Sequence, residues 1–346
     1  MKIASIELHN FRSHKNARFS FNDGVNVIVG ENGIGKTNIL EAIHFLATAK
    51  SHRTNHEREM ITHGEDFAFI KAEFEARDRS NTIEGRLWKQ GKKQFQKNFV
   101  PIRKTSDLMG FISVIMFAPQ DLSIIQGSPS IRRKFLDLAI CQMSKKYFSL
   151  ISTYNRILAQ KNKLLKTDDA VNKIEMLEVW NAQLAGAGEA INEFRGNYLE
   201  LLAEHARKHF YEMMGKSLEI SYIPNGNGIL GDLEKNIKKA LKKEIKNQQA
   251  EIGPHRDDFL IKIGGTEGKE FASQGQQRTA VIALKKAQLD ILCERLDEPP
   301  ILLLDDVMSE LDRPRQHLLL DDKMQCQTII TATRSKKATI FLTNNE

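Results

Sequence analysis

The sequence of 346 residues contains few cysteines and no long apolar segment. Its three cysteines lie far apart and form no C-x-x-C pair, so neither a zinc site nor a disulfide framework is predicted. No apolar run approaches the roughly 20 residues that a membrane-spanning helix needs. The first residues alternate as in a strand and lack the continuous apolar segment of a signal peptide. We therefore expect a cytoplasmic protein with no membrane-spanning part.

Acidic residues are fewer than basic ones, and the formal net charge of +7 weakly favours a polyanionic partner. Three clusters concentrate the basic residues, although a solvated surface explains each of them equally well. The third cluster has apolar residues at every fourth position, which predicts a helix with a buried stripe. The clusters are Lys89, Lys92, Lys93, Lys97, Arg103 and Lys104; Arg132, Arg133 and Lys134; and Lys235, Lys238, Lys239, Lys242, Lys243 and Lys246, with the stripe Ile237, Leu241 and Ile245.

Residues 30–37 match the phosphate-binding pattern G-x-x-x-x-G-K-[ST] without a mismatch. A strand pattern precedes the loop and a helix pattern follows it, which disfavours the alternative of a glycine turn with a chance Lys-Thr. The glycines let backbone N–H groups surround phosphate oxygens at a helix N-terminus. Lys36 is then expected to reach the β- and γ-phosphates of ATP, and the Thr37 hydroxyl to bind Mg²⁺. The predicted nucleotide-binding residues are Gly30, Glu31, Asn32, Gly33, Ile34, Gly35, Lys36, Thr37 and Asn38.

The order of patterns along the chain predicts an α/β fold built from both of its ends. The first part alternates as strands, interrupted by the helix after the phosphate loop. Residues 130–216 contain no proline and keep a helical spacing, with a turn expected at 167–169 between two long helices. Strand and helix patterns alternate again after that. We expect an α/β head formed by residues 1–125 and 217–346, with an all-helical domain inserted at 126–216.

A short apolar strand, Ile301–Leu304, runs directly into Asp305 and Asp306. Alone this pattern is common, but after a phosphate-binding loop it is typical of a Walker B strand. Ligands of open α/β folds bind at the carboxyl ends of parallel strands. We therefore expect Asp305 to hold Mg²⁺ and Asp306 to polarise the water that attacks the γ-phosphate.

The segment Ala272–Arg278 opens a predicted helix and allows two interpretations. Ser273 is a good N-cap residue, which is a purely structural role. The same segment matches the signature motif of ATP-binding-cassette ATPases, whose serine hydroxyl and helix N-terminus contact the γ-phosphate held by the opposite subunit. In that interpretation Ser273, Gly275 and Gln276 are nucleotide-binding residues. The later segment Ser309–Asp312 matches the D-loop of the same ATPases.

These elements follow the order of cassette-superfamily head ATPases, and within their chromosome-maintenance and recombination-repair branch the chain resembles the RecF family. The short central module argues against relatives whose halves are separated by a very long coiled coil. The matches extend from about residue 1 to about residue 333. They are Ile6–Arg12, Gly30–Asn38, Phe117–Leu122, Gly127–Pro129, Arg132–Asp137, Leu177–Trp180, Gly253–Asp258, Ser273–Ala280, Leu303–Asp306 and Ser309–Asp312.

The resemblance implies an ABC/SMC-type P-loop ATPase head that forms a homodimer on ATP and binds single-stranded and duplex DNA at gap junctions. It implies a weak, DNA-stimulated ATPase that uses Mg²⁺, and the mediators RecO and RecR as partners in loading the RecA recombinase. Gln120 matches a residue that links Mg²⁺ and the γ-phosphate to conformational change, and Arg12 matches a basic residue near the phosphates. A loop glutamine and a surface arginine explain these two positions equally well.

Other cassette ATPases carry a switch histidine after the strand that follows Walker B, where this chain reads Thr328–Thr333. A hydroxyl cannot take up and return a proton as an imidazole does, so slow turnover is expected. Asp306 replaces the usual glutamate and is one methylene shorter, which points the same way. Two alternatives use the same motifs: the nucleotide-binding subunit of a transporter and a nucleotide-switched scaffold. The missing histidine, the missing transmembrane partner sequence and the basic clusters disfavour the transporter.

Overall fold

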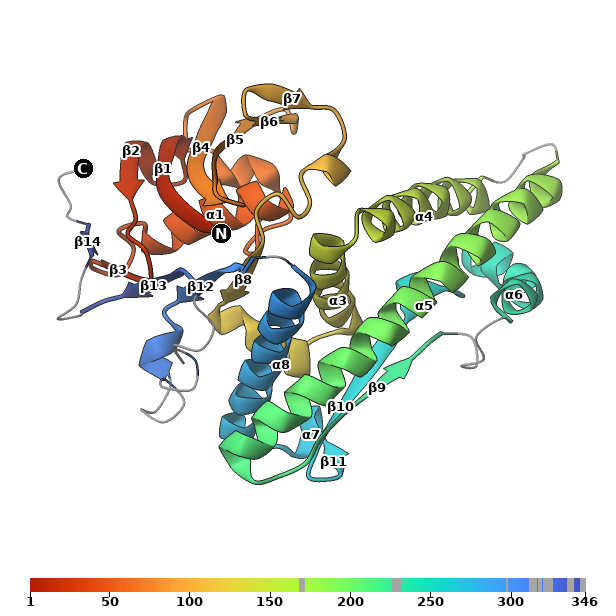
Figure 1. The fold of residues 1–346 in the computed structure, drawn as a ribbon. Coiled ribbons are helices and arrows are strands. Elements are labelled where there is room, and N and C mark those ends of the chain that lie inside the picture. Colours follow the sequence, from red (N-terminus) through yellow and green to blue (C-terminus); the bar gives the residue numbers. More distant parts are fainter. Residues whose placement is uncertain are drawn as a thin grey trace. The chain divides into compact units, whose positions relative to one another are not determined.

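The computed structural model describes residues 1–167, 172–225, 232–296, 298–310, 316, 319, 326–334 and 339–342. The chain divides into two compact units, one formed by Met1–Asp121 with Gln288–Glu346 and the other by Leu122–Ala287 (Figure 1). The first unit joins the two ends of the chain. Within the described residues, no helix combines the length and apolar character needed to cross a membrane.

Six strands of the first unit form an antiparallel sheet in the order β2-β1-β4-β5-β6-β7. Side chains along β4 show the two-residue period of a strand with one buried face, since Ala68, Ile70, Ala72 and Phe74 are buried. The strands are β1 (Lys2–Phe11), β2 (His14–Ser20), β4 (Phe67–Ala76), β5 (Arg79–Trp88), β6 (Lys93–Lys97) and β7 (Val100–Ile102).

Five strands of the same unit form a second sheet in the order β14-β3-β13-β12-β8, and every neighbouring pair is parallel. Their carboxyl ends therefore share one edge. Helix α1 (Lys36–Thr48) follows β3, contacts strands of both sheets and is buried along nearly its whole length. The strands are β3 (Val25–Val29), β8 (Val114–Phe117), β12 (Ile301–Asp305), β13 (Thr328–Ala332) and β14 (Ile340–Phe341).

The second unit combines long helices with a three-stranded antiparallel sheet in the order β11-β10-β9. Helix α8 (Gln274–Arg295) begins in this unit and ends in the first. The other elements are α3 (Pro129–Met143), α4 (Lys145–Leu165), α5 (Lys173–Met214), α6 (Leu233–Asn247), β9 (Leu218–Ile223), β10 (Asp258–Ile263) and β11 (Thr266–Glu267). The short helical turns among the described residues are η1 (Glu57–Met60), η2 (Thr105–Asp107), η3 (Pro119–Leu122), α2 (Ser123–Gln126), η4 (Pro254–Arg256), α7 (Gly268–Phe271) and η5 (Val307–Glu310).

The second unit is larger than the helical segment expected at 126–216, because it continues to Ala287 and includes the small sheet. Within the described residues of 126–216, three helices (α3, α4 and α5) lie where two long helices were expected. The extra break lies at Ser144, whose extended backbone ends α3 and whose hydroxyl accepts a hydrogen bond from the N–H of Tyr147 in the first turn of α4. Asp168 and Asp169 of the expected turn lie outside the described residues.

A buried polar network centres on Arg195 of α5 and explains much of the segment Gly253–Asp258. Arg195 donates from Nε to Asp137 at 3.0 Å and from NH1 to the carbonyl oxygen of Pro254 at 2.7 Å. Asp257 is buried beside it and accepts hydrogen bonds from the N–H of Asn225 at 2.6 Å and from the hydroxyl of Tyr222. Because buried charges need partners, this segment organises the interior of the second unit.

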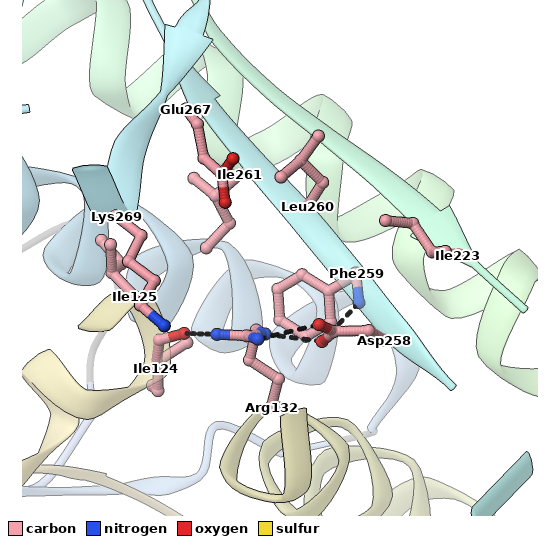
Figure 2. Close-up of a pocket in the computed structure, with 10 residues that line it drawn as sticks. All are labelled: Ile124, Ile125, Arg132, Ile223, Asp258, Phe259, Leu260, Ile261, Glu267 and Lys269. Carbon is pink, nitrogen blue, oxygen red and sulfur yellow. Dashed lines mark hydrogen bonds and ion pairs between the residues drawn. The ribbon is translucent and has the colours of Figure 1, made fainter. Parts of the chain in front are cut away.

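The buried Arg132 forms an ion pair with the half-buried Asp258 beside a small pocket (Figure 2). Nε and NH2 of Arg132 donate to the two carboxylate oxygens of Asp258 at 2.6 and 2.8 Å. The pocket holds about 50 Å³, far less than the roughly 300–1,000 Å³ typical of small-molecule sites. Arg133 likewise donates to the carbonyl oxygen of Asp257 at 2.6 Å. Two members of the basic cluster 132–134 therefore have structural partners within the unit.

Candidate nucleotide-binding site

The phosphate-binding loop joins β3 to α1 and depends on glycine at two positions. Gly33 and Gly35 have φ angles of 86° and 111°, which residues with a Cβ rarely adopt. A Cβ on Gly35 would also lie 2.6 Å from Nε2 of His14 and 2.7 Å from Oγ of Ser13. The loop therefore lies tightly against the β1–β2 turn, and its path is fixed by glycine geometry.

Lys36 lies inside the loop and is 7% exposed. Its ammonium donates to the carbonyl oxygens of Gly30 at 2.7 Å and Glu31 at 2.8 Å. An ammonium has three N–H donors, so Lys36 can hold the loop and still donate to a phosphate oxygen. The start of α1 adds the favourable partial charge of a helix N-terminus.

Thr37 and Asp305 meet directly although they are 268 positions apart in the chain. The Thr37 hydroxyl donates to Oδ1 of Asp305 at 2.7 Å, and the Thr331 hydroxyl donates to the same oxygen at 2.9 Å. This geometry follows from the parallel sheet, because Asp305 and Thr331 are paired in the register of β12 and β13. Asp305, the predicted Walker B aspartate, is thus placed at the end of the phosphate-binding loop.

Asp305 is 4% exposed, and burial raises the pKa of its carboxyl group above the ordinary value, although the hydroxyls of Thr37 and Thr331 counteract part of that shift. The next residue, Asp306, has a φ of 51° and donates its backbone N–H to Oγ1 of Thr331 at 2.9 Å. One threonine side chain therefore fixes both consecutive acids. Aspartate tolerates this left-handed backbone better than most residues.

Gln120 follows β8 in the short helical turn η3 and is exposed. Its turn is fixed by the N–H of Ala118, which donates to Oδ2 of Asp121 at 2.8 Å. Because β8 is paired in parallel with β12, Gln120 lies at the same sheet edge as Asp305. Four parallel strands thus end at one edge of the sheet. The phosphate-binding loop, Gln120, the two aspartates and Thr331 lie at or directly after these strand ends.

Arg12 forms a bidentate ion pair with the fully buried Glu41 of α1, with N–O distances of 2.7 and 2.9 Å. NH1 of Arg12 also donates to the carbonyl oxygen of Glu59 at 2.6 Å. Arg53 contacts Glu41 at 3.4 Å and donates to Asn38 at 3.0 Å. Arg12 therefore helps to anchor the first turns of α1, and two of its five N–H donors have no partner among these contacts.

Ser273 is the N-cap of α8 in a reciprocal capping box. Its hydroxyl accepts from the N–H of Gln276 at 3.3 Å, and its own N–H donates to Oε1 of Gln276 at 2.9 Å. This confirms the structural interpretation of Ser273, and it leaves the hydroxyl proton free to donate elsewhere. Ser273, Gln274 and Gly275 are exposed at the start of this 22-residue helix. Their predicted contact with a γ-phosphate stays a prediction.

Sequence reasoning did not name Thr331 or Glu41 as site residues. Thr331 could have been found, because it occupies the strand position next to Asp305 once the sheet order is known. Glu41 gave no signal, because a glutamate inside a helix is normally solvated. Of the predicted D-loop, Leu311 and Asp312 lie outside the described residues.

Comparison with known proteins agrees with this geometry. The model of the RecF/RecN/SMC N terminal domain family matches residues 2–341. The DNA replication and repair protein RecF of Clostridium kluyveri is 40% identical over 338 residues, which cover 96% of this chain and 93% of that protein. RecF of Clostridium perfringens strain 13 is 38% identical over 350 residues, covering 100% and 96% of the two chains.

Solved structures give the same result. The recombination mediator protein RecF in its RecF-ATP structure is 34% identical, has a TM-score of 0.91, and is matched over 97% of this chain and 93% of that one. The Smc head domain of Pyrococcus furiosus is 20% identical, with a TM-score of 0.55 over 96% and 90% of the two chains. The expected ABC/SMC-type head fold is therefore confirmed, and the chain belongs to the RecF family of DNA replication and repair proteins.

Proposed function

We propose that the chain is an ATP-dependent DNA-binding protein that dimerises on ATP and hydrolyses it slowly. The observation that carries this proposal is the contact between Thr37, at the end of the phosphate-binding loop, and the Walker B residue Asp305. ATP is supported by the RecF-ATP structure of the relative with a TM-score of 0.91. Its setting is DNA replication, gap repair and recombination.

Mg²⁺ fits the same pair of residues. A hydroxyl oxygen and a carboxylate oxygen 2.7 Å apart are ligands that this hard cation prefers, together with phosphate oxygens. A cation would also offset the cost of burying the Asp305 carboxylate. Thr37 and Asp305 would hold the ion, with Gln120 from the same sheet edge. When bound, the ion would supply positive charge that neutralises negative charge on phosphate oxygens.

Hydrolysis is assigned to Lys36 and Asp306. Lys36 stabilises negative charge on the β- and γ-phosphate oxygens, and Asp306 orients the attacking water. Thr331 positions both acids but has no group that accepts and returns a proton near neutral pH. Together with the short side chain of Asp306, this favours slow turnover.

The site is completed by the partner subunit in this proposal. The exposed start of α8 offers the Ser273 hydroxyl proton and the backbone of Gly275 and Gln276 to a γ-phosphate. Because the capping box already orders this turn, no rearrangement is required before it contacts an anion. ATP would then join two subunits across two shared sites. Arg12 is a further candidate for phosphate contact through its remaining donors.

The proposed partners are single-stranded and duplex DNA at gap junctions, with RecO and RecR. They are supported by the RecF relatives, named DNA replication and repair proteins, and by the solved RecF structures of the RecFOR pathway. Loading of the RecA recombinase is the activity that this pathway implies for the chain.

The proposal is tested by ATP-dependent DNA binding across a salt series. A protein that contacts several phosphates releases counterions, so log K should fall by about 0.7 to 0.9 per contact for each tenfold rise in salt. Salt-independent DNA binding, or equal binding without ATP, would contradict the proposed ATP-dependent DNA binding. DNA-stimulated ATPase activity separates the proposal from a nucleotide-switched scaffold, which would hydrolyse ATP at the same rate with and without DNA.

A further inference from the structure

The β6–β7 hairpin lies in the first unit (Figure 1). The phenylalanine Phe99 lies in the turn that joins its two strands. Phe99 is 70% exposed and its neighbour Val100 is 65% exposed. The hairpin ends in β7, the edge strand of the antiparallel sheet. Pro101 lies within β7 and lacks a backbone N–H, which disfavours pairing of this edge with another strand. The exposed apolar surface of this hairpin therefore consists of the side chains of Phe99 and Val100.

The backbone at the tip is unusual for such a bulky residue. Asn98 and Phe99 form a two-residue turn between paired Lys97 and Val100, with φ angles of 48° and 65°. Turns of this kind favour Asn at the first position and Gly at the second, because a Cβ is sterically disfavoured there. The β4–β5 hairpin instead has Asp78 at its second position, a residue that tolerates the left-handed region. Phe99 thus occupies a position where glycine would fold more easily.

The turn is also held rigidly. The N–H of Asn98 donates to the carbonyl oxygen of Thr82 at 2.8 Å, and the N–H of Thr82 donates to Oδ1 of Asn98 at 2.8 Å. Nδ2 of Asn98 donates to Oδ1 of Asn81 at 3.1 Å. These bonds fix the hairpin end to β5, so Phe99 is presented to solvent by a preorganised backbone.

The surroundings of Phe99 in the sequence are strongly basic. Residues 85–106 contain seven lysines and arginines and no acid. Some of these cations have partners within the unit. Nζ of Lys97 lies 3.7 Å from the centre of the Phe111 ring, and Lys93 forms an ion pair with Glu57. Others are exposed and, within the described part of the chain, have no side-chain partner; these are Lys92, Arg103 and Lys104.

We propose that Phe99 is a base-stacking residue that contacts an unpaired base of a nucleic acid strand. An exposed aromatic ring, followed four and five residues later in the chain by the exposed cations Arg103 and Lys104, suits a ligand with both flat apolar bases and phosphates. Arg103 and Lys104 follow β7 and supply the phosphate contacts. The ring binds a base of any sequence, because every base has a flat face. This inference rests on the proposed DNA binding and extends it to a specific surface.

Phe99→Gly separates binding from folding, because glycine adopts the φ of this position without strain. The variant should keep or raise the thermal unfolding midpoint. With ATP present, its affinity for oligo-dT should fall about fivefold or more, which is the lower range for losing one stacked base. Affinity for duplex DNA of the same length should change less than about twofold, since paired bases are not available for stacking.

Two further variants complete the experiment. Phe67→Ala removes another exposed phenylalanine of the same sheet, 47% exposed, and should leave oligo-dT affinity unchanged. Phe99→Trp should retain oligo-dT affinity, and its added fluorescence, measured against the parent with Trp88 and Trp180, should be quenched by oligo-dT. Quenching reports direct stacking, which a purely structural role of residue 99 would not produce.

The outcomes are distinct. If the parent binds oligo-dT and Phe99→Gly binds it equally well, or Phe99→Trp is not quenched, base stacking is wrong while the DNA-binding proposal stands. An equal loss of single-stranded and duplex binding would also contradict stacking. If the parent protein binds no DNA in the presence of ATP at any salt concentration, the proposed function itself is contradicted.

Discussion

The hydroxyl of Thr331 donates a 2.9 Å hydrogen bond to Oδ1 of Asp305, its neighbour across the β12–β13 pair. The same hydroxyl accepts the backbone N–H of Asp306 at 2.9 Å. A strand residue that is unremarkable in sequence therefore sets the orientation of both acids. A threonine hydroxyl orients these two residues but does not take up or release a proton near neutral pH.

Thr331→Val keeps the shape of the side chain but removes this link. The Asp306 N–H loses its partner and the buried Asp305 carboxylate loses a donor, so stability should fall by about 1–3 kcal/mol. ATPase activity should fall by more than the loss of folded protein explains. Thr328→Val is the matched control, since Thr328 is a buried threonine of the same strand whose hydroxyl donates to the carbonyl oxygen of Cys326. Equal effects of the two changes on ATPase activity would refute the positioning role.

Asp306→Asn removes the carboxylate assigned to water activation and leaves Asp305 to hold Mg²⁺. Asparagine tolerates the φ of 51° at this position, so the backbone should be preserved. ATP hydrolysis should fall by about 10²-fold or more, while ATP binding remains. The ATP-bound dimer should then stay on DNA longer, as measured by dissociation kinetics. If the variant releases DNA as fast as the parent does, the catalytic role assigned to Asp306 is wrong.

Because His255 is buried, we predict that the protein loses stability in mild acid. Burial lowers the pKa of His255 to about 4, and its ring contacts the Tyr154 hydroxyl at 2.7 Å and the carbonyl oxygen of Ala250 at 3.1 Å. The unfolded chain protonates this ring near pH 6.5. Between about pH 6.5 and 4 the unfolded state therefore binds more protons, and stability falls as the pH falls.

This one group should lower the free energy of unfolding by about 2 kcal/mol between pH 7 and pH 5. His255→Gln removes the titration, so urea denaturation of that variant should show a smaller difference between the two pH values. Parallel pH dependence of the parent and His255→Gln would contradict a neutral buried His255.

The elements around the phosphate-binding loop were predictable because their sequence patterns are local. The strand pattern predicted before the loop corresponds to β3 (Val25–Val29), a mainly apolar segment that ends directly before the first glycine of the loop. Asp305 was predicted at the carboxyl end of a buried strand for the same reason. The sequence patterns did not predict turns that contain neither glycine nor proline. Strand β6 ends at Lys97, and the chain turns at Asn98 and Phe99 without a glycine or proline. The break at Ser144 interrupts a sequence pattern typical of one continuous helix.

Contacts between distant residues were not predictable from periodicity. Helix α6 was expected to bury Ile237, Leu241 and Ile245, but its buried residues are Leu233, Ile237 and Glu244. Glu244 is buried because it forms an ion pair with the buried Lys161 of α4 at 2.6 Å. A charged residue on a lysine-rich helix gives no sign of such a partner, which lies 83 positions earlier in the chain.

The central claim, that two subunits share each ATP site, is tested most directly by mixing two inactive variants. Lys36→Ala should lose transition-state contacts with the phosphates, and Ser273→Arg should block the surface offered to the partner's nucleotide. In a mixed dimer one site carries both lesions, while the other combines an intact Lys36 with an intact Ser273. An equal mixture should recover up to about a quarter of the parental ATPase rate, because half of the dimers are mixed and each has one intact site. Recovery should rise with protein concentration, since dimerisation is bimolecular. If the mixture stays as inactive as either variant while crosslinking shows mixed dimers, the shared site is contradicted.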